Sequence, residues 1–167
     1  MAGLRQKSKQ PLYASLYWLA ERCWTLLLAP LWMLLIYYLS AMPGDESARL
    51  SDKFLVRKLA HFTEYGILAL LFLIFWAALF HLMRRKKSLE AWCLEAELQL
   101  LPLAKLLALA WVSATFYAVT DEWHQIFVPG RVGSLRDVVL DSAGALFFLI
   151  VALLLLLWGQ GRSERRY

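Results

Sequence analysis

Residues 138–158 read VVLDSAGALFFLIVALLLLLW, a run of 21 residues in which Asp141 is the one charged side chain. A helix of about 20 apolar residues, rising about 1.5 Å per residue, is long enough to cross the hydrocarbon core of a bilayer. This stretch therefore predicts a membrane-spanning helix, and the fold of the chain must be built around it.

The rest of the chain contains three further apolar blocks of similar length. They run from about Arg22 to Ala41, from Leu59 to Met83 and from Leu101 to Ile126. Of the 167 residues, 60% are apolar and 19% are charged, whereas a soluble domain has roughly 45–50% apolar and about 25% charged residues. The composition excludes a disordered or collagen-like chain and predicts an all-α integral membrane protein with four transmembrane helices.

The predicted organisation is a four-helix membrane domain over residues 22–158, between a basic segment (1–21) and a short tail (159–167). The longest connection between the blocks, residues 84–100, carries apolar residues at helical spacing, among them Leu89, Trp92 and Ala96. This pattern predicts a short interfacial helix.

The basic residues divide unevenly between the two sides of the predicted bundle. Six of the 18 fall near the connections that follow the first and third blocks: Arg49, Lys53, Arg57, Lys58, Arg131 and Arg136. The formal charge is +7 on the other side and −2 on this one, within a total of +5. Because Lys and Arg near helix ends mark the cytoplasmic side, we predict that both termini and the interfacial helix are cytoplasmic. The balance favours contact with anionic membrane lipids and gives no indication of nucleic acid as a partner.

Ionisable side chains interrupt three of the apolar blocks, all near the predicted outer side. His61, Glu64 and Tyr65 follow Lys58 at the start of the second block. The third block ends with Tyr117, Asp121, Glu122, His124 and Gln125, and the fourth begins with Asp137 and Asp141. Glu64 and Asp141 lie within about two turns of the outer ends of their helices, and Asp121 lies near the outer boundary. Because ionisable residues inside a membrane usually serve a function, we expect one shared, outward-facing polar pocket.

The residue types in this pocket leave several roles open. The candidates for acid–base catalysis are His61, Glu64, Asp121 and His124. The candidates for ligand binding are Lys58, Tyr65, Tyr117, Glu122, Gln125, Arg131, Arg136, Asp137 and Asp141, with Arg131 and Arg136 able to hold an anion. A divalent cation is a candidate cofactor, with the carboxylates of Glu64, Asp121, Glu122, Asp137 and Asp141 as ligands. The alternative is a hydrogen-bonded network that only holds the helices together.

The connection before the fourth helix has a local signal of its own. Val128 to Gly133 is rich in turn-forming residues, and Ser134 is followed three residues later by Asp137. This spacing is typical of a capping box, which would start the fourth helix at Ser134. Asp137 therefore also has a purely structural interpretation as a capping residue.

Three segments resemble the VanZ-like family: LSAMPG (39–44), KLAHFTEYGILALL (58–71) and TDEWHQIFVPGRVGSLRDVVLDSAG (120–144). The resemblance implies a small four-helix protein of the bacterial inner membrane, and the member that gives the family its name is associated with low-level resistance to the glycopeptide teicoplanin. The resemblance does not imply any particular enzymatic reaction. Carried over by position, its motif residues are His61, Glu64, Tyr65, Asp121, Glu122, His124, Gln125, Arg131, Asp137 and Asp141.

The sequence departs from the family pattern at two positions. Asp141 stands where the family often has Asn, which adds negative charge to the expected pocket. Phe148 stands where the family often has a second glycine, and its bulk argues against a close helix crossing at that point.

Two functions from different classes follow from these observations. The first is a membrane protein that binds or modifies a cell-envelope lipid headgroup or a glycopeptide and so confers low-level, teicoplanin-type resistance. The second is an intramembrane enzyme, a phosphohydrolase or transferase that acts on a lipid-linked phosphate with metal or histidine assistance. The expected partners are membrane lipids, with a lipid-linked envelope precursor or a glycopeptide as candidate ligands.

Overall fold

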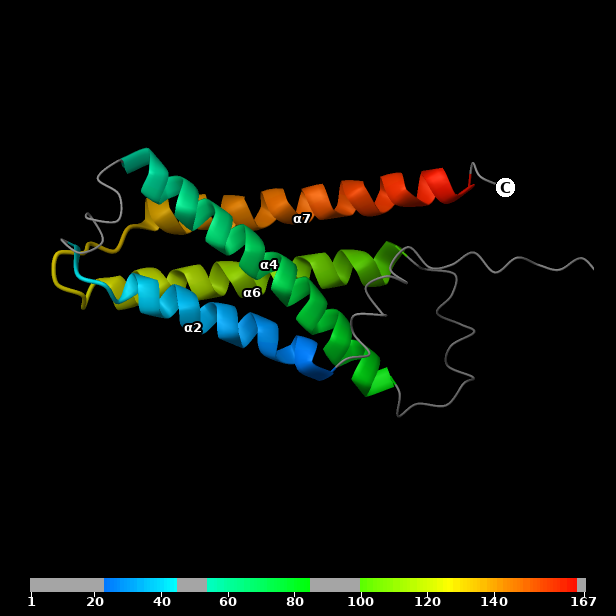
Figure 1. Ribbon diagram of the computed structural model, residues 1–167, viewed down its shortest axis with the longest axis horizontal. Coiled ribbons are helices and arrows are strands. Elements are labelled where there is room, and N and C mark those ends of the chain that lie inside the picture. The colour runs from blue at the N-terminus through cyan, green and yellow to red at the C-terminus, as the bar shows by residue number, and fades with distance from the viewer. Residues whose placement is uncertain (1–22, 45–53, 85–99, 165–167) are drawn as a thin grey trace, which may run out of the picture.

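The computed structural model describes residues 23–44, 54–84 and 100–164, and every regular element within these ranges is a helix. A 3₁₀ turn, η1 (Cys23–Leu27), leads into α2 (Leu28–Ser40). The longer helices are α4 (Phe54–Arg84), α6 (Leu100–Gln125) and α7 (Leu135–Glu164). Successive helices alternate in direction, so α2 and α6 end where α4 and α7 begin (Figure 1). We call this end of the bundle the loop end.

Three of the helices are long and apolar enough to cross a membrane. The qualifying segments are Leu55–Phe80, Leu103–Gln125 and Leu135–Gly159. The chain is therefore a multi-pass membrane protein. Both α4 and α7 exceed the predicted blocks, because the segment before Leu59 and the start of the predicted tail join the same continuous helices.

The first of the four predicted spans is shorter than expected. Its apolar helical segment is Trp24–Ser40, below the length of the other three. Pro30 lies in the first turn of α2 and has no N–H to bond to the carbonyl four residues earlier, so the preceding residues wind as a 3₁₀ turn. Five 3₁₀ residues at about 2.0 Å each and thirteen α-helical residues at about 1.5 Å each still give a length near the hydrocarbon thickness of about 30 Å.

Two predictions concern residues that the structure does not describe. The interfacial helix falls almost wholly within residues 85–99, and the basic segment is residues 1–21; both lie outside the described residues.

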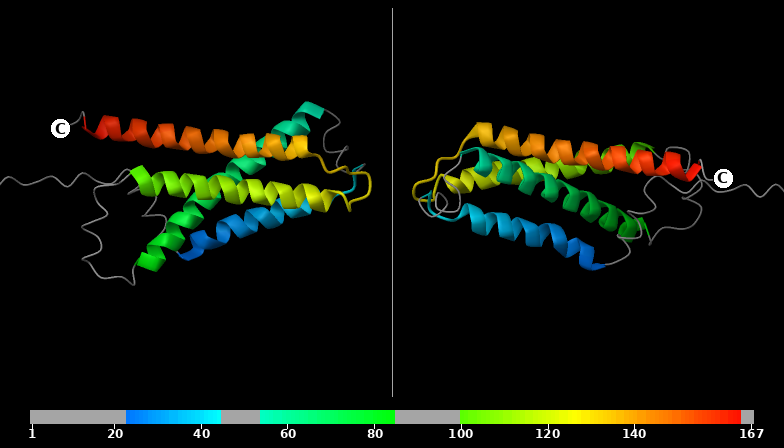
Figure 2. Two further views of the ribbon diagram at one scale, coloured as in Figure 1. Left: turned by 180° about the vertical axis from the view of Figure 1, so that it is seen from behind. Right: turned by 45° about the horizontal axis from the view of Figure 1, so that its top comes forward.

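Helix α4 is the central element of the bundle. It contacts η1, α2, α6 and α7, and it runs diagonally across the other helices in each view (Figures 1 and 2). Helix α6 in turn contacts both α7 and α2. Residues on α4 can therefore meet residues from all the other helices.

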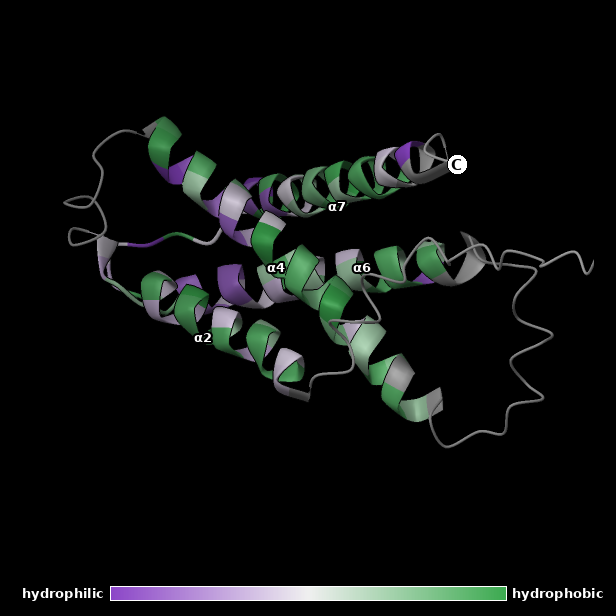
Figure 3. Ribbon diagram, turned by 45° about the vertical axis from the view of Figure 1, so that its right-hand side comes forward, coloured by the Kyte–Doolittle hydropathy of each residue, from purple (hydrophilic) through white to green (hydrophobic). Residues whose placement is uncertain are grey.

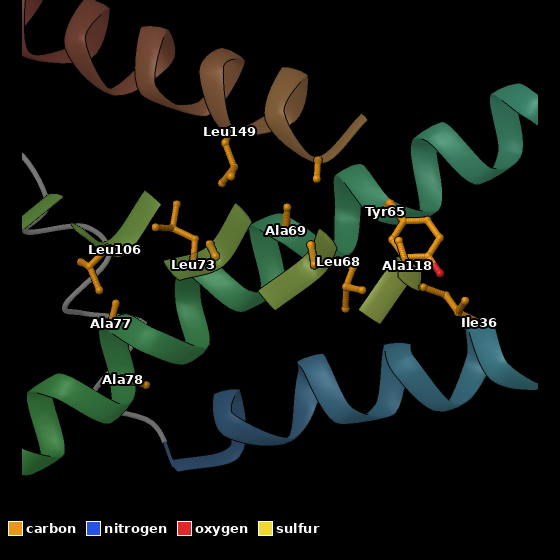
Figure 4. Packing of buried hydrophobic residues seen from close by; sticks show 13 residues of the cluster. Ile36, Tyr65, Leu68, Ala69, Leu73, Ala77, Ala78, Leu106, Ala118 and Leu149 are labelled. Atoms are coloured by element: carbon orange, nitrogen blue, oxygen red, sulfur yellow. The ribbon is translucent and has the colours of Figure 1, made fainter. Parts of the chain in front are cut away.

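The core between these helices is built largely from small side chains. Ala110, Ala114 and Ala118 form one buried stripe of α6. Ala69, Leu73 and Ala77 of α4 are buried in the same apolar cluster (Figure 4). Small side chains let helix backbones approach closely, which is how helices associate in lipid, where apolar burial alone gives little gain. The apolar core therefore fixes how the stripes of α4 and α6 face each other.

Helices α4 and α7 approach each other closely at Gly144. A Cβ atom at Gly144 would lie 2.2 Å from the carbonyl oxygen of Phe62, closer than real atoms come. The absent side chain therefore allows the two backbones to touch, one turn beyond Asp141.

The surface of the bundle is strongly apolar away from the loop end. Phe116, Val112 and Val119 on α6 and Leu154 and Leu155 on α7 are exposed, as expected for side chains that face lipid tails. Hydrophilic residues of α4, α6 and α7 gather toward the loop end, apart from those at the far end of α7 (Figure 3). Apolar side chains are also exposed at the loop end, among them Val132, Leu135 and Phe127, so it is the interior of the bundle that divides into an apolar half and a polar half.

Candidate functional site

The polar half contains buried and half-buried polar side chains from three helices. We call them the polar cluster: His61, Glu64 and Tyr65 from α4, Asp121, Glu122 and Gln125 from α6, and Asp141 from α7. Asp121 and Gln125 continue the alanine stripe of α6 by one and two turns, which explains why both are buried. Asp141 and Tyr65 are fully buried. The convergence of polar residues from three helices, predicted from their spacing, is found in the structure.

Asp121 is the electrostatic centre of this cluster. It acts on His61 and Glu64 across the α4 interface, and on Tyr65 and Asp141. Arg131 acts on His61 and Glu64 as well. The five acids predicted to lie together, Glu64, Asp121, Glu122, Asp137 and Asp141, do interact, since the other four all act on Asp141.

Many buried polar atoms of the cluster have no hydrogen-bond partner. Among the described residues, the unpartnered atoms of the cluster are His61 Nδ1, Tyr65 Oη, Asp121 Oδ1, Glu122 Oε1 and both carboxylate oxygens of Asp141. Such atoms are rare in native proteins, and each costs about 1–3 kcal/mol when it is left without a partner. Their concentration at one place makes the polar cluster the candidate functional site of the described residues.

Glu122 joins α6 to the start of α7. Its Oε2 accepts a hydrogen bond of 2.7 Å from the backbone N–H of Ser134, and the Ser134 hydroxyl accepts one of 3.2 Å from the N–H of Arg136. The predicted cap at Ser134 is confirmed, but a different residue completes it. In a capping box the acid at Asp137 would bind the Ser134 N–H; here Glu122 does so, because the side chain of Asp137 points to α4.

Asp137 forms an ion pair with Lys58 of α4, and both side chains are partly exposed. The pair links the first turn of α7 to the first turns of α4. Lys58 and Asp137 thus lie at the edge of the polar cluster and bind each other.

Arg131 binds the end of α2. Its Nε donates to the carbonyl oxygen of Met42 and its Nη2 to that of Leu39, each at 3.2 Å. These carbonyls belong to the last turn of α2 and the residues after it, which have no helical donors of their own. Arg131, predicted as an anion ligand, therefore uses two donors to fix the loop end, while the Arg136 side chain is exposed.

The same loops touch through two glycines. The Gly44 N–H donates to the carbonyl of Pro129 at 3.0 Å, and a Cβ at Gly44 would lie 2.1 Å from the Gly130 carbonyl oxygen. Gly130 has a φ of +74°, a conformation that favours glycine. The two Pro-Gly turns therefore pack directly against each other at the loop end.

The predicted polar stripe of α6 divides between two neighbours. Asp121 and Gln125 face the cluster and bind each other, with Gln125 Nε2 donating to Asp121 Oδ2 at 3.0 Å. Tyr117 donates to the Met33 carbonyl at 2.6 Å, and the His124 ring packs on Tyr37 with centroids 4.6 Å apart. Tyr117 and His124 therefore contact α2, although Tyr117 also lies beside Tyr65.

One contact of the site was absent from the sequence prediction. Trp32 of α2 donates from Nε1 to the carbonyl oxygen of Glu64 at 3.0 Å, which ties the α4 backbone at the cluster to α2. Nothing in the local sequence pattern marks Trp32, because its partner lies 32 residues away.

The described residues do not form the divalent-cation site that was one of the candidates from the sequence. Within residues 23–44, 54–84 and 100–164, no three His, Cys, Asp or Glu side chains are grouped so that they could hold a metal ion. The acids are close enough to interact electrostatically, but their oxygens do not converge on one point.

Comparison with models of known families gives a match over most of the chain. The sequence model of the VanZ/LLP1 family matches residues 24–157. The chain belongs to the VanZ/LLP1 family. This confirms the resemblance carried by the three motif segments. No curated protein and no solved structure matched the chain in the corresponding comparisons.

Within the VanZ/LLP1 match, the departure at Phe148 has a structural explanation. The Phe148 ring occupies the place of a side chain at Gly66, since a Cβ there would lie 2.3 Å from Phe148 Cδ2. A close approach of α4 and α7 at this level is therefore retained, contrary to the expectation from the bulk of Phe148. The glycine is on α4 and the large ring on α7.

Proposed function

We propose that this VanZ/LLP1 protein uses the polar cluster to bind the headgroup of a cell-envelope lipid, and that low-level, teicoplanin-type glycopeptide resistance follows from this binding. The observation that carries the proposal is the set of unpartnered buried atoms, most of which are carboxylate oxygens. Oxygens of this kind accept hydrogen bonds. They therefore suit a headgroup rich in donors, such as sugar hydroxyls or an ammonium group.

The charge balance of the site supports the same class of ligand. Five carboxylates surround the site, whereas its two nearest cations, Lys58 and Arg131, are bound to Asp137 and to backbone carbonyls. A phosphate would meet uncompensated negative charge in a medium where such charges interact strongly. A neutral or cationic headgroup would not.

The distribution of basic residues supports a location in the outer leaflet of a bacterial inner membrane. Under the positive-inside rule both termini are cytoplasmic, and they follow or precede helix ends opposite to the loop end (Figure 1). The cluster would then face the outer leaflet, where envelope precursors and glycopeptides meet. The apolar faces of α6 and α7 give a lipid ligand a surface for its acyl chains.

The alternative proposal is an intramembrane phosphohydrolase or transferase. It draws support from His61, whose Nδ1 is unpartnered and whose strongest charged neighbour is Asp121. A histidine beside a carboxylate is a common general base. The alternative is weaker because it needs a cation to hold the phosphate, and Arg131 is engaged elsewhere.

Resistance in a teicoplanin-susceptible bacterium that expresses the chain tests the proposal. We expect Asp121→Asn to abolish the rise in the inhibitory concentration given by the wild-type chain. Thr63→Ala is the matched control, because Thr63 is exposed and bonds only to the Leu59 carbonyl within its own helix. Equal resistance for wild type and Asp121→Asn, at equal membrane levels, would contradict the proposal.

Binding by the purified protein in lipid nanodiscs distinguishes the ligands. We expect retention of phosphatidylethanolamine or a glycolipid over phosphatidylglycerol in native mass spectrometry, and loss of this preference in Asp121→Asn. Direct retention of teicoplanin instead would identify the antibiotic as the ligand. Release of inorganic phosphate from polyprenyl or glycerolipid phosphates, measured with and without EDTA, would favour the enzyme.

A further inference from the structure

Asp141 is the most deeply buried acid of the described residues. Its exposed fraction is 0%, and neither carboxylate oxygen has a hydrogen-bond partner within the described part of the chain. An isolated carboxylate transferred from water to such surroundings is very costly, and a carboxyl group usually takes up a proton instead. Burial alone therefore favours the neutral form of this side chain.

The neighbouring charges act in the same direction. The charged groups with the strongest effect on Asp141 are Glu122 and Asp121 from α6, Asp137 from α7 itself and Glu64 from α4. All four are acids, and like charges disfavour a further carboxylate. The nearby cation Lys58 binds Asp137 at the edge of the cluster.

Tyr65 connects Asp141 to the centre of the cluster. Its hydroxyl is fully buried and interacts with both Asp121 and Asp141, yet within the described residues it makes no hydrogen bond of good geometry. Asp121 Oδ2 already accepts from Gln125, whereas Asp121 Oδ1 is unpartnered. Donor and acceptor positions thus remain open at Asp141, Tyr65 and Asp121 together.

We propose that Asp141 binds one proton and that Asp141, Tyr65 and Asp121 form an intramembrane proton relay. The protonated Asp141 carboxyl donates to the Tyr65 oxygen, and the Tyr65 hydroxyl donates to Asp121 Oδ1. A single added proton then satisfies three of the unpartnered atoms. The relay leaves His61 Nδ1, Glu122 Oε1 and the second Asp141 oxygen for the headgroup that the proposed function assigns to the site.

The relay can shift its proton without changing the net charge of the site. The O–H bond of Asp141 breaks as a new one forms on the Tyr65 oxygen, and the original Tyr65 O–H bond breaks as one forms on Asp121 Oδ1. Asp141 becomes the carboxylate and Asp121 the neutral acid. The site can thus present a proton either at the buried end or at the electrostatic centre.

Infrared spectroscopy of the full-length chain in nanodiscs at pH 7 tests the proposal. We expect a carbonyl-stretch band of a protonated carboxyl group, sensitive to exchange into heavy water, that is lost in Asp141→Asn. Asp137→Asn is the matched control and keeps the band, because Asp137 is ion-paired. Tyr65→Phe keeps the band but moves it to higher frequency, since the carboxyl loses its acceptor.

Three outcomes would overturn the proposal. The wild type could lack the band, Asp141→Asn could keep it unchanged, or Tyr65→Phe could leave its frequency unaltered, which would remove Tyr65 from the relay. A measurement on the wild type alone keeps the proposal testable even if a variant fails to fold. With ¹³C at the aspartate carboxyl carbons, we expect one signal with the chemical shift of a neutral acid, and its absence would also refute the proposal.

Discussion

The buried stripe of helix α6 is apolar along most of its length and polar near the loop end. From Leu103 to Ala118 the buried positions are apolar and mostly alanine, and they pack directly against α4. One turn further along, Asp121 and Gln125 occupy equivalent positions, with unpartnered polar atoms around them. The backbone geometry is the same in both halves, so the difference lies in what the side chains are selected for.

The apolar half stabilises the fold, whereas the polar half reduces its stability. Closely packed small side chains stabilise a helix pair in lipid, whereas buried polar groups without partners destabilise the fold. Sites kept at a cost in stability are usually functional. The two halves should therefore respond in opposite ways to substitution.

The largest effect is expected from overpacking the apolar half. Ala114→Leu adds three carbon atoms to a fully buried position on α6 and should lower the free energy of unfolding by about 3 kcal/mol. Val112→Leu, on the exposed face of the same helix, should have little effect. Denaturant unfolding in mixed micelles, followed by tryptophan fluorescence, measures both. If Ala114→Leu left the free energy of unfolding unchanged, the proposed difference between the two halves would be wrong.

A smaller loss is expected where the loop end is tied to α2. Arg131→Lys removes the planar group that reaches the carbonyls of Leu39 and Met42, and should cost about 2 kcal/mol because both bonds involve a charged donor. Arg136→Lys is the control, because that side chain is exposed. The same unfolding assay applies, and equal stability of the two variants would show that the loop contact carries little energy.

The smallest effect has the opposite sign. Asp121→Asn removes the repulsion with Glu64 and Glu122, and the Gln125 amide can rotate to accept from the introduced amide. We expect a gain of about 1 kcal/mol in unfolding free energy, as for other sites that exchange stability for function. Asp137→Asn should instead lose a little, since it removes an ion pair. Destabilisation by Asp121→Asn would mean that the cluster is a structural network.

Much of this architecture could be predicted from local patterns. Apolar length alone identifies the three long helices, and the i, i+3, i+4 spacing from His61 to Tyr65 places one polar stripe on α4. The Ser134 cap was predictable because its signal lies within four residues. The convergence of the stripes followed because the apolar blocks fix how far each polar residue lies from its helix end.

The pairing of residues within the site could not be predicted. The bond of Glu122 to the Ser134 N–H and the pair of Lys58 with Asp137 depend on the rotation of each helix about its axis. That rotation is set by the alanine stripes and by Gly144, through packing between residues far apart in sequence. For the same reason, nothing in the local sequence indicated that Tyr117 and His124 contact α2 while Asp121 faces the polar cluster.

The contact of Phe148 with Gly66 has a consequence for the evolution of the family. The two positions share one volume between α4 and α7, since the ring fills the space that a side chain at Gly66 would need. A larger residue at position 66 becomes tolerable only after position 148 has become small. Likewise, a large residue at position 148 is tolerable only while position 66 is glycine. Glycine at position 148 would therefore open room for a side chain at position 66.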